Sequence, residues 1–423
     1  MARSLDSESL SRVVALRDWL VTVAARMEDP NEVLIGFIQR LIELGLPLDR
    51  VASAIETLHS EYAGIGRFWT REEGAVVRYL PHGTRREAVY QQSPFAHVNR
   101  TGEWLMLDLA ETPDDLFAIV PELKEAGLRH YLTIPIRFTN GAENGISFAT
   151  RSPEGFGERG LIILRLVMPS FALVTELRAT SNRLDQVLRI YVGDDPHRAI
   201  LSGAIQRGQV TRIRSAILFA DMRDYTRISS TLSPESAVEL LNTYFDCLVP
   251  PIEDEGGEVL KYLGDGLLAI VRDQGDDTGG APQSALTAAT NALRRVQTAN
   301  DEGRFPAPIQ VGIALHHGDA AYGNVGSGQR LDFTVIGDTV NTAAHIESLT
   351  KKLRVRKLIG EATYEVVKDK IEAHGPMFES NKHGDQMIVY ELLGWSDSSS
   401  PASYVSKIER EQLGFSDFKV ASE

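Results

Sequence analysis

Two aspartates stand where the chain is expected to reverse direction, and together they could hold metal ions. Asp221 follows the apolar segment 215–220, and Asp265 lies between Gly264 and Gly266, in a short turn between two strand-like segments. The glycines allow positive φ and close approach of a ligand, and backbone N–H groups point outward at such reversals. If the two strands are neighbours, the carboxylates face each other and suit hard divalent cations. Taken singly, each aspartate also fits an ordinary turn.

A second group of polar residues follows a later strand-like segment. Asn341 and His345 are four residues apart, so they project from one face of the helix that Asp338 is expected to cap. Thr334 lies on the strand that leads into this helix. An asparagine near a helix cap is more often a solvated or cap-supporting residue, so this segment alone names no function.

The elements that must position these residues alternate between strand and helix. Apolar segments at 215–220, 258–262, 267–271, 309–315 and 333–336 predict strands, and the periodicity predicts helices at 234–250, 284–300 and 338–353. This alternation favours an α/β or α+β sandwich in which strand ends converge on one site.

Taken together, the order and spacing of these segments resemble the catalytic domain of the class III nucleotidyl cyclases over residues 211–394. The resemblance implies a ferredoxin-like βαββαβ core within an α+β protein. It also implies a homodimer with composite active sites at its interface. The implied reaction is attack of the 3′-hydroxyl of ATP on the α-phosphorus, giving 3′,5′-cyclic AMP and pyrophosphate, with two Mg²⁺ or Mn²⁺ ions per site.

The same resemblance assigns roles by position. Asp221 and Asp265 match the metal-binding aspartates, and the Met222 carbonyl matches a further metal ligand. Lys261 and Thr334 match the residues that read the base, and this pair implies adenine rather than guanine. Asn341 matches the residue that positions the ribose. The turn that matches the triphosphate cradle comprises Met222, Arg223, Asp224, Tyr225 and Thr226.

Basic or titratable side chains stand at three further places in this domain. The family's transition-state arginine is replaced by His345, and a histidine is only partly cationic at neutral pH. We therefore expect a slow or acid-favoured enzyme, or a partner that supplies the missing cation. Lys382 is the nearest candidate for a phosphate-binding lysine, with a register ambiguous by one or two residues. The basic run that begins at Lys351 and Lys352 favours a solvated helix end over a phosphate contact.

The first half of the chain carries no comparable motif. Residues 1–60 are expected to be helical, and residues 61–180 contain short strand-like segments and a long exit helix. This order resembles a GAF-type sensory domain, although an αβ dimerisation domain without a ligand fits equally well. Residues 181–210 are expected to form a linker helix, which often pairs with its copy in a dimer, and a connector. Residues 395–423 resemble a flexible tail.

Composition sets the remaining expectations for the 423-residue chain. A net charge of −14 argues against an extended polyanion such as nucleic acid as partner. A single cysteine, Cys247, excludes an intrachain disulfide and favours a reducing, cytoplasmic setting. The longest apolar stretch, 161–177, is interrupted by Arg165 and Pro169, so no membrane span is expected. The alternative to an active enzyme is a weak or inactive cyclase homologue that binds nucleotide as a regulatory partner.

Overall fold

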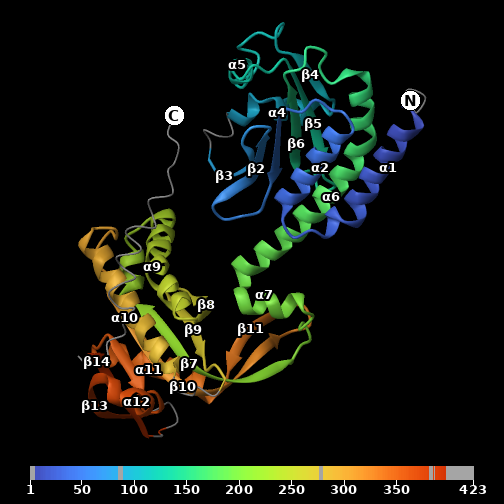
Figure 1. Ribbon diagram of the computed structural model, residues 1–423. Coiled ribbons are helices and arrows are strands. Elements are labelled where there is room, and N and C mark those ends of the chain that lie inside the picture. The colour runs from blue at the N-terminus through green and yellow to red at the C-terminus, as the bar shows by residue number, and fades with distance from the viewer. Residues whose placement is uncertain (1–4, 84–88, 276–279, 381–383, 385, 397–423) are drawn as a thin grey trace. The chain divides into compact units, whose positions relative to one another are not determined.

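The computed structural model describes residues 5–83, 89–275, 280–380, 384 and 386–396. The chain divides into two compact units, Met1–Leu188 and Arg189–Glu423. Each unit has its own sheet and its own core, and together they make an α+β protein (Figure 1).

The first unit is built on a six-stranded antiparallel sheet with the strand order β3-β2-β1-β6-β5-β4. Its elements are α1 (Ser7–Thr22), η2 (Ala24–Arg26), α2 (Pro30–Glu43), β1 (Arg50–Glu56), β2 (Tyr62–Thr70), β3 (Gly74–Pro81), α4 (Pro94–Thr101), β4 (Leu105–Asp108), α5 (Val120–Glu125), β5 (His130–Arg137), β6 (Glu143–Thr150) and α6 (Gly157–Val192).

Side-chain alternation along the central strands divides this unit into layers. Leu132 and Ile134 of β5 join α1, α2 and the first part of α6 in the main core, and these helices lie together on one face of the sheet (Figure 1). Tyr131 of β5 and Ala149 of β6 point to the other face, where they pack with α5. Successive strand residues therefore serve opposite layers, as the pleat of a strand requires.

One sequence expectation for this unit is wrong and another is confirmed. Residues 50–56 were expected to be helical, but they form β1, which pairs with both β2 and β6. Its small residues Ala52, Ser53 and Ala54 give little apolar alternation because the strand is covered on both faces. The long exit helix expected in this part of the chain is present as α6, which continues through Pro169 for 36 residues.

Among the described residues, α6 is the one helix long and apolar enough to cross a membrane by length and composition. Core helices of globular proteins satisfy the same criterion. The buried side chains of α6, among them Ile163, Leu164 and Val167, pack into the main core of the first unit.

The second unit has an eight-stranded sheet with the order β13-β14-β12-β10-β7-β9-β8, and β11 pairs with β10. Its elements are α7 (Asp194–Leu201), β7 (Val210–Met222), α8 (Tyr225–Ser229), α9 (Pro234–Asp254), β8 (Glu258–Leu263), β9 (Gly266–Arg272), α10 (Gly280–Asp301), β10 (Val311–Gly326), β11 (Leu331–Ile336), α11 (Asp338–Leu353), β12 (Lys357–Gly360), α12 (Glu361–Val367), η3 (Lys368–Lys370), β13 (Ile371–Ser380) and β14 (Gln386–Trp395).

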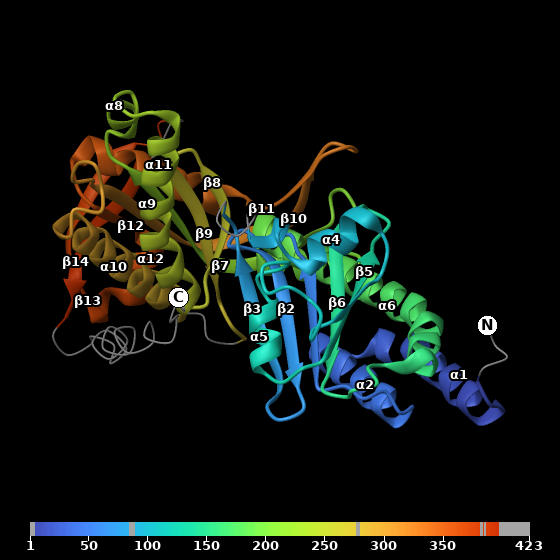
Figure 2. The same cartoon turned by 90° about the horizontal axis from the view of Figure 1, so that it is seen from above.

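The centre of this unit has the βαββαβ order. β7, α9, β8, β9, α10 and β10 come in this order along the chain, with the short helix α8 between β7 and α9, and their four strands lie in the order β10-β7-β9-β8. Apolar side chains of α9 and α10 pack on one face of the sheet, with Leu218 and Ala220 of β7. Ala343 of α11 packs on the other face with Ile217. Figure 2 shows the same unit from above.

Candidate active site

Asp221 and Asp265 meet at the ends of two neighbouring strands. Asp221 lies near the end of β7 and pairs in register with Gly266, the first residue of β9. The Met222 N–H donates to the Asp265 carbonyl at 3.3 Å, which ties the two chain reversals together. A side chain at Gly266 would place its Cβ 2.8 Å from the Ala220 carbonyl oxygen, so glycine is required for this approach. The structure therefore brings the two aspartates together, as the strand pattern predicts.

Electrostatics in this cluster favour the entry of a cation. Burial, followed by the charge of Asp221, raises the pKa of Asp265 above its usual range. Burial and then Asp221 also raise the pKa of Glu347 on α11, and Glu347 Oε1 is buried without a hydrogen-bond partner among the described residues. Three acidic groups therefore repel one another in a partly dehydrated place, which a divalent cation would relieve.

One positive charge already lies in the cluster. The Lys351 ammonium forms an ion pair with Asp221 Oδ2. Burial alone would lower the pKa of Lys351, but the ion pair with Asp221 and the charge of Glu347 raise it. The expectation of a merely solvated helix end is therefore wrong for Lys351. Neighbouring Lys352 pairs instead with Glu379, at 2.6 Å.

Sequence reasoning missed both Glu347 and Lys351. They lie one helical turn apart, and Glu347 is six residues after Asn341, so the helix of Asn341 also reaches the aspartates. The helical spacing from Asn341 was the signal available in the sequence. It indicates that Glu347 and Lys351 contact the aspartates only once the strand packed against this helix is known.

The turn after Asp221 offers fewer free amides than its length suggests. The N–H groups of Met222 and Arg223 are engaged by the Asp265 and Gln310 carbonyls. Within the part of the chain that the structure describes, the N–H groups of Asp224, Tyr225 and Thr226 have no such acceptor. Asp224 has a φ of 57°, which turns the chain into α8.

Lys261 reaches the strand that carries Thr334. Its ammonium on β8 forms an ion pair with Asp332 on β11, and Asp332 lies two residues before Thr334, on the same side of the strand. Thr334 is 8% exposed and pairs in register with Gly323. Asp332 is a further residue that sequence reasoning missed.

Asn341 and His345 occupy the first half of α11. Asn341 is exposed, and its backbone N–H donates to the Gly337 carbonyl at 3.1 Å. His345 Nε2 donates to the Ser380 carbonyl of β13 at 3.0 Å, and its Nδ1 is buried. Among the described residues, no hydrogen bond or ion pair joins either side chain to Asp221 or Asp265 within one chain. Lys382 lies outside the described residues.

Known proteins with similar sequences cover the same part of the chain. Residues 210–394 match the model of the adenylate and guanylate cyclase catalytic domain. The chain is 38% identical over 164 residues to an adenylate cyclase of Anabaena cylindrica, covering 37% of this chain and 32% of the relative. It is 28% identical over 201 residues to adenylate cyclase 1 of Rhizobium meliloti, covering 47% and 30% respectively.

The chain thus spans about a third of the length of these curated relatives. Among solved structures, the adenylyl cyclase CyaB from P. aeruginosa matches with a TM-score of 0.42 and 22% identity, over 46% of this chain and all of that one. The converging aspartates and the βαββαβ order of the second unit agree with the match of residues 210–394 to the adenylate and guanylate cyclase catalytic domain.

Proposed function

We propose that the protein is an adenylate cyclase that converts ATP to 3′,5′-cyclic AMP and pyrophosphate. The observation that carries the proposal is the meeting of Asp221 and Asp265 across β7 and β9. Asp221 and Asp265 would hold the Mg²⁺ or Mn²⁺ ions, which would supply activation of the 3′-oxygen and neutralisation of charge on the triphosphate. The two carboxylates repel each other and offer only oxygen ligands, and both properties fit such ions.

The remaining roles belong to side chains and amides of the chain itself. Lys261 and Thr334 would read the adenine, and Asn341 would orient the ribose. The free N–H groups of Asp224, Tyr225 and Thr226 would donate to phosphate oxygens. Positioning is the main task of the protein in such a displacement, so the proposal needs no dedicated side-chain base.

A homodimer would complete the site. Asn341 and His345 make no hydrogen bond or ion pair to the aspartates of their own chain in the described residues, so a second copy would bring these groups together. α6 offers a surface for pairing, because Leu173, Leu177 and Leu184 are more than half exposed at a spacing of four and then seven residues. Tyr191 continues the spacing by seven and is 83% exposed. Such a stripe is typical of a two-stranded coiled coil.

The first unit would regulate the catalytic domain through α6. Its six-stranded antiparallel sheet covered by helices supports a GAF-like sensory role, and α6 leads directly from its core toward the second unit. Comparing the cyclase rate of the full chain with that of a chain beginning near Gly208 tests this regulation. Equal rates under all conditions would contradict it.

The activity itself is tested with purified full-length protein, ATP and Mg²⁺ or Mn²⁺, with cyclic AMP measured by chromatography. Asp221→Asn preserves the shape of the side chain but removes its charge, and we expect it to lower the rate about a hundredfold or more. Asp319→Asn, an exposed aspartate on β10, serves as the control and should stay within about twofold. Wild-type protein no faster than Asp221→Asn would refute the enzymatic function.

The dimer is tested separately by sedimentation. Leu184→Glu places a charge in the α6 stripe and should give a monomer without cyclase activity, since the composite site could not form. Leu116→Glu, at a leucine that is 49% exposed outside this stripe, should leave both mass and rate unchanged. An active, dimeric Leu184→Glu protein would exclude the α6 stripe as the interface.

His345 favours a second candidate function, a weak or inactive homologue that binds nucleotide as a regulatory partner. The cyclase family has an arginine at the position of His345. The His345 ring is instead hydrogen-bonded to the main chain of β13. Saturable ATP binding without cyclic AMP production would support this alternative. Comparable turnover of GTP would instead contradict the base-reading roles of Lys261 and Thr334.

A further inference from the structure

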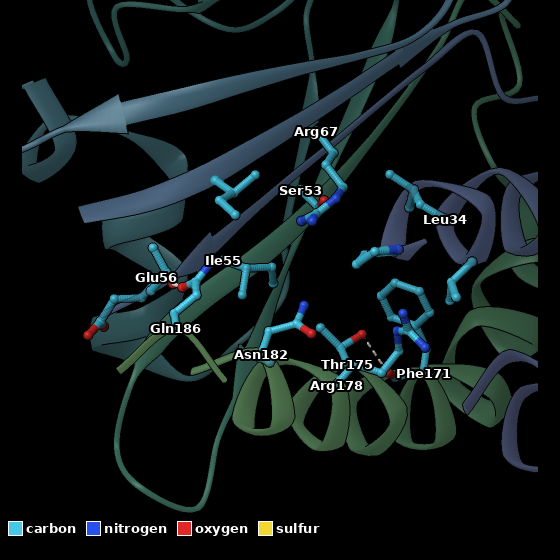
Figure 3. A pocket seen from close by; sticks show the side chains of 15 residues that line it. Leu34, Ser53, Ile55, Glu56, Arg67, Phe171, Thr175, Arg178, Asn182 and Gln186 are labelled. Atoms are coloured by element: carbon cyan, nitrogen blue, oxygen red, sulfur yellow. Dashed lines mark hydrogen bonds between the residues drawn. The ribbon is translucent and has the colours of Figure 1, made fainter. Parts of the chain in front are cut away.

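The first unit contains a cavity between its sheet and the helices α2 and α6 (Figure 3). Leu34, Ile55 and Phe171 supply apolar walls, and Ser53, Arg67 and Asn182 supply polar groups. Its volume is about 70 Å³, and one water molecule needs roughly 10–15 Å³. The cavity therefore has room for a molecule of roughly five or six non-hydrogen atoms.

Arg67 and Arg178 are the two basic residues in the lining of this cavity. Arg178 donates to the main-chain carbonyls of Met27 and Glu28, so Arg67 is the one available to a ligand. It lies on β2 directly opposite Ser53 of β1, and Figure 3 shows both side chains reaching from the sheet into the cavity. Arg67 Nε donates to Asn31 Oδ1 at 2.9 Å. Among the described residues, no hydrogen-bond acceptor is found for its two terminal amino groups. Planar, paired N–H donors of this kind match the two oxygens of a carboxylate.

Nearby acids do not neutralise this guanidinium directly. Asp29 is close enough to act on Arg67 through its charge, but its carboxylate caps α2 by accepting from the Asn31 N–H at 2.8 Å. Glu56 is the acid in the cavity lining, and its carboxylate points away from Arg67 in Figure 3. Burial lowers the pKa of Arg67, and the neighbouring Arg178 acts in the same direction. An incoming anion would oppose both effects.

Two further polar groups lie close to the same space. Among the described residues, the Ser53 hydroxyl and the Asn182 amide have no hydrogen-bond partner. Ser53 is 5% exposed, so its hydroxyl lies beside Arg67 inside the cavity. Asn182 is exposed on α6 and rises toward the sheet in Figure 3, which places it at the solvent side. A small ligand could therefore enter past Asn182 and meet Ser53 and Arg67.

We propose that this cavity binds a small monocarboxylate with a short apolar chain. Its carboxylate accepts from the terminal amino groups of Arg67 and from Ser53, and its chain lies against Ile55 and Phe171. The charge of Arg67 and the apolar walls argue against two other classes of ligand, inorganic anions and neutral amides. An inorganic anion would leave the apolar walls without a partner, and a neutral amide would leave the buried charge without one.

The proposal is tested by calorimetric titration of the full-length protein with butyrate. We expect a Kd of about 1 mM, as befits six non-hydrogen atoms. Butyramide, which has the same shape without the charge, should bind about 10- to 100-fold more weakly, and inorganic phosphate should show no saturable binding at this site. No saturable binding of butyrate at about 30 mM, or equal binding of butyramide, would overturn the proposal.

Two variants assign the binding to this cavity. Arg67→Met removes the charge but keeps an extended side chain, and it should weaken butyrate about 10- to 100-fold. Arg78→Met, at an exposed arginine on the adjacent strand β3, should bind butyrate as the wild type does. Ala179→Leu fills the cavity from α6 without touching any charge and should also abolish binding. Unchanged affinity in both Arg67→Met and Ala179→Leu would place the ligand elsewhere. These measurements do not depend on cyclase activity.

Discussion

His345→Arg is the substitution that tests the proposed chemistry most directly. In the structure, His345 Nε2 donates to the Ser380 carbonyl at 3.0 Å. A neutral imidazole has one N–H, so this bond leaves it no donor for a substrate oxygen. An arginine has five N–H donors and a permanent charge. It can keep the bond to Ser380 and still donate to a developing phosphoryl charge.

The size of the effect follows from the loss of one charged donor. Removing a single donor to a developing anion costs about 3 kcal/mol, or about a hundredfold in kcat. His345 is half-buried on α11, so solvent would not screen the new charge fully. We therefore expect kcat of His345→Arg to exceed that of the wild type by up to about a hundredfold at pH 8.

The assay is cyclic AMP formation at pH 8 and saturating Mg²⁺, with kcat and KM determined from the dependence of the rate on ATP concentration. Ala344→Arg, at the exposed neighbouring position of α11, adds the same charge outside the Asn341 and His345 face and should leave kcat unchanged. An arginine variant no faster than the wild type would refute the argument from the missing charge. An equal gain from Ala344→Arg would assign the effect to the charge of the helix as a whole.

Two further predictions concern titratable groups in the second unit. Burial, and then Asp195, raise the pKa of Glu258 from 4.5 to about 7. The folded chain keeps this proton while the unfolded chain loses it, so the stability that neutral Glu258 contributes falls as pH rises from 4.5 to about 7. The free energy of unfolding of Glu258→Gln, relative to that of the wild type, should therefore rise by about 2 kcal/mol between pH 4.5 and 8, seen as a growing difference in Tm. A difference in Tm that stays constant with pH would contradict the raised pKa of Glu258. Lys351→Met removes the ion pair with Asp221 and should lower the Mg²⁺ concentration for half-maximal rate about threefold. An unchanged or higher Mg²⁺ requirement would show that this pair does not compete with the metal.

Local sequence signals identified the parts of the site that depend on one element or on adjacent strands. Asp221 and Asp265 were predictable because a strand end and a tight turn each leave a strong local pattern, and β7 and β9 proved to be neighbours. Lys351 was not, because a basic run at a helix end has the same appearance whether or not a carboxylate lies opposite. Asp332 was missed for the same reason, since only the approach of β8 to β11 pairs it with Lys261.

The error in the fold has a similar physical origin. β1 lacks apolar alternation because both of its faces are covered, so small residues such as Ser53 suffice. Tertiary packing there decides the structure against the local preference. The exit helix was predictable from its periodicity, and core contacts on both sides of Pro169, such as those of Val167 and Phe171, hold α6 in place although a proline usually ends a helix.

The strand β7 has a mechanical consequence for the catalytic domain. It begins at Val210, soon after α7, and reaches Asp221 within a single strand of 13 residues. β10 pairs with it along its whole length, and β9 pairs with residues 215–221. Residues 215–221 are therefore held on both edges and contain no loop that could absorb a displacement. A shift of Ser215 along the strand would move the Asp221 carboxylate with it.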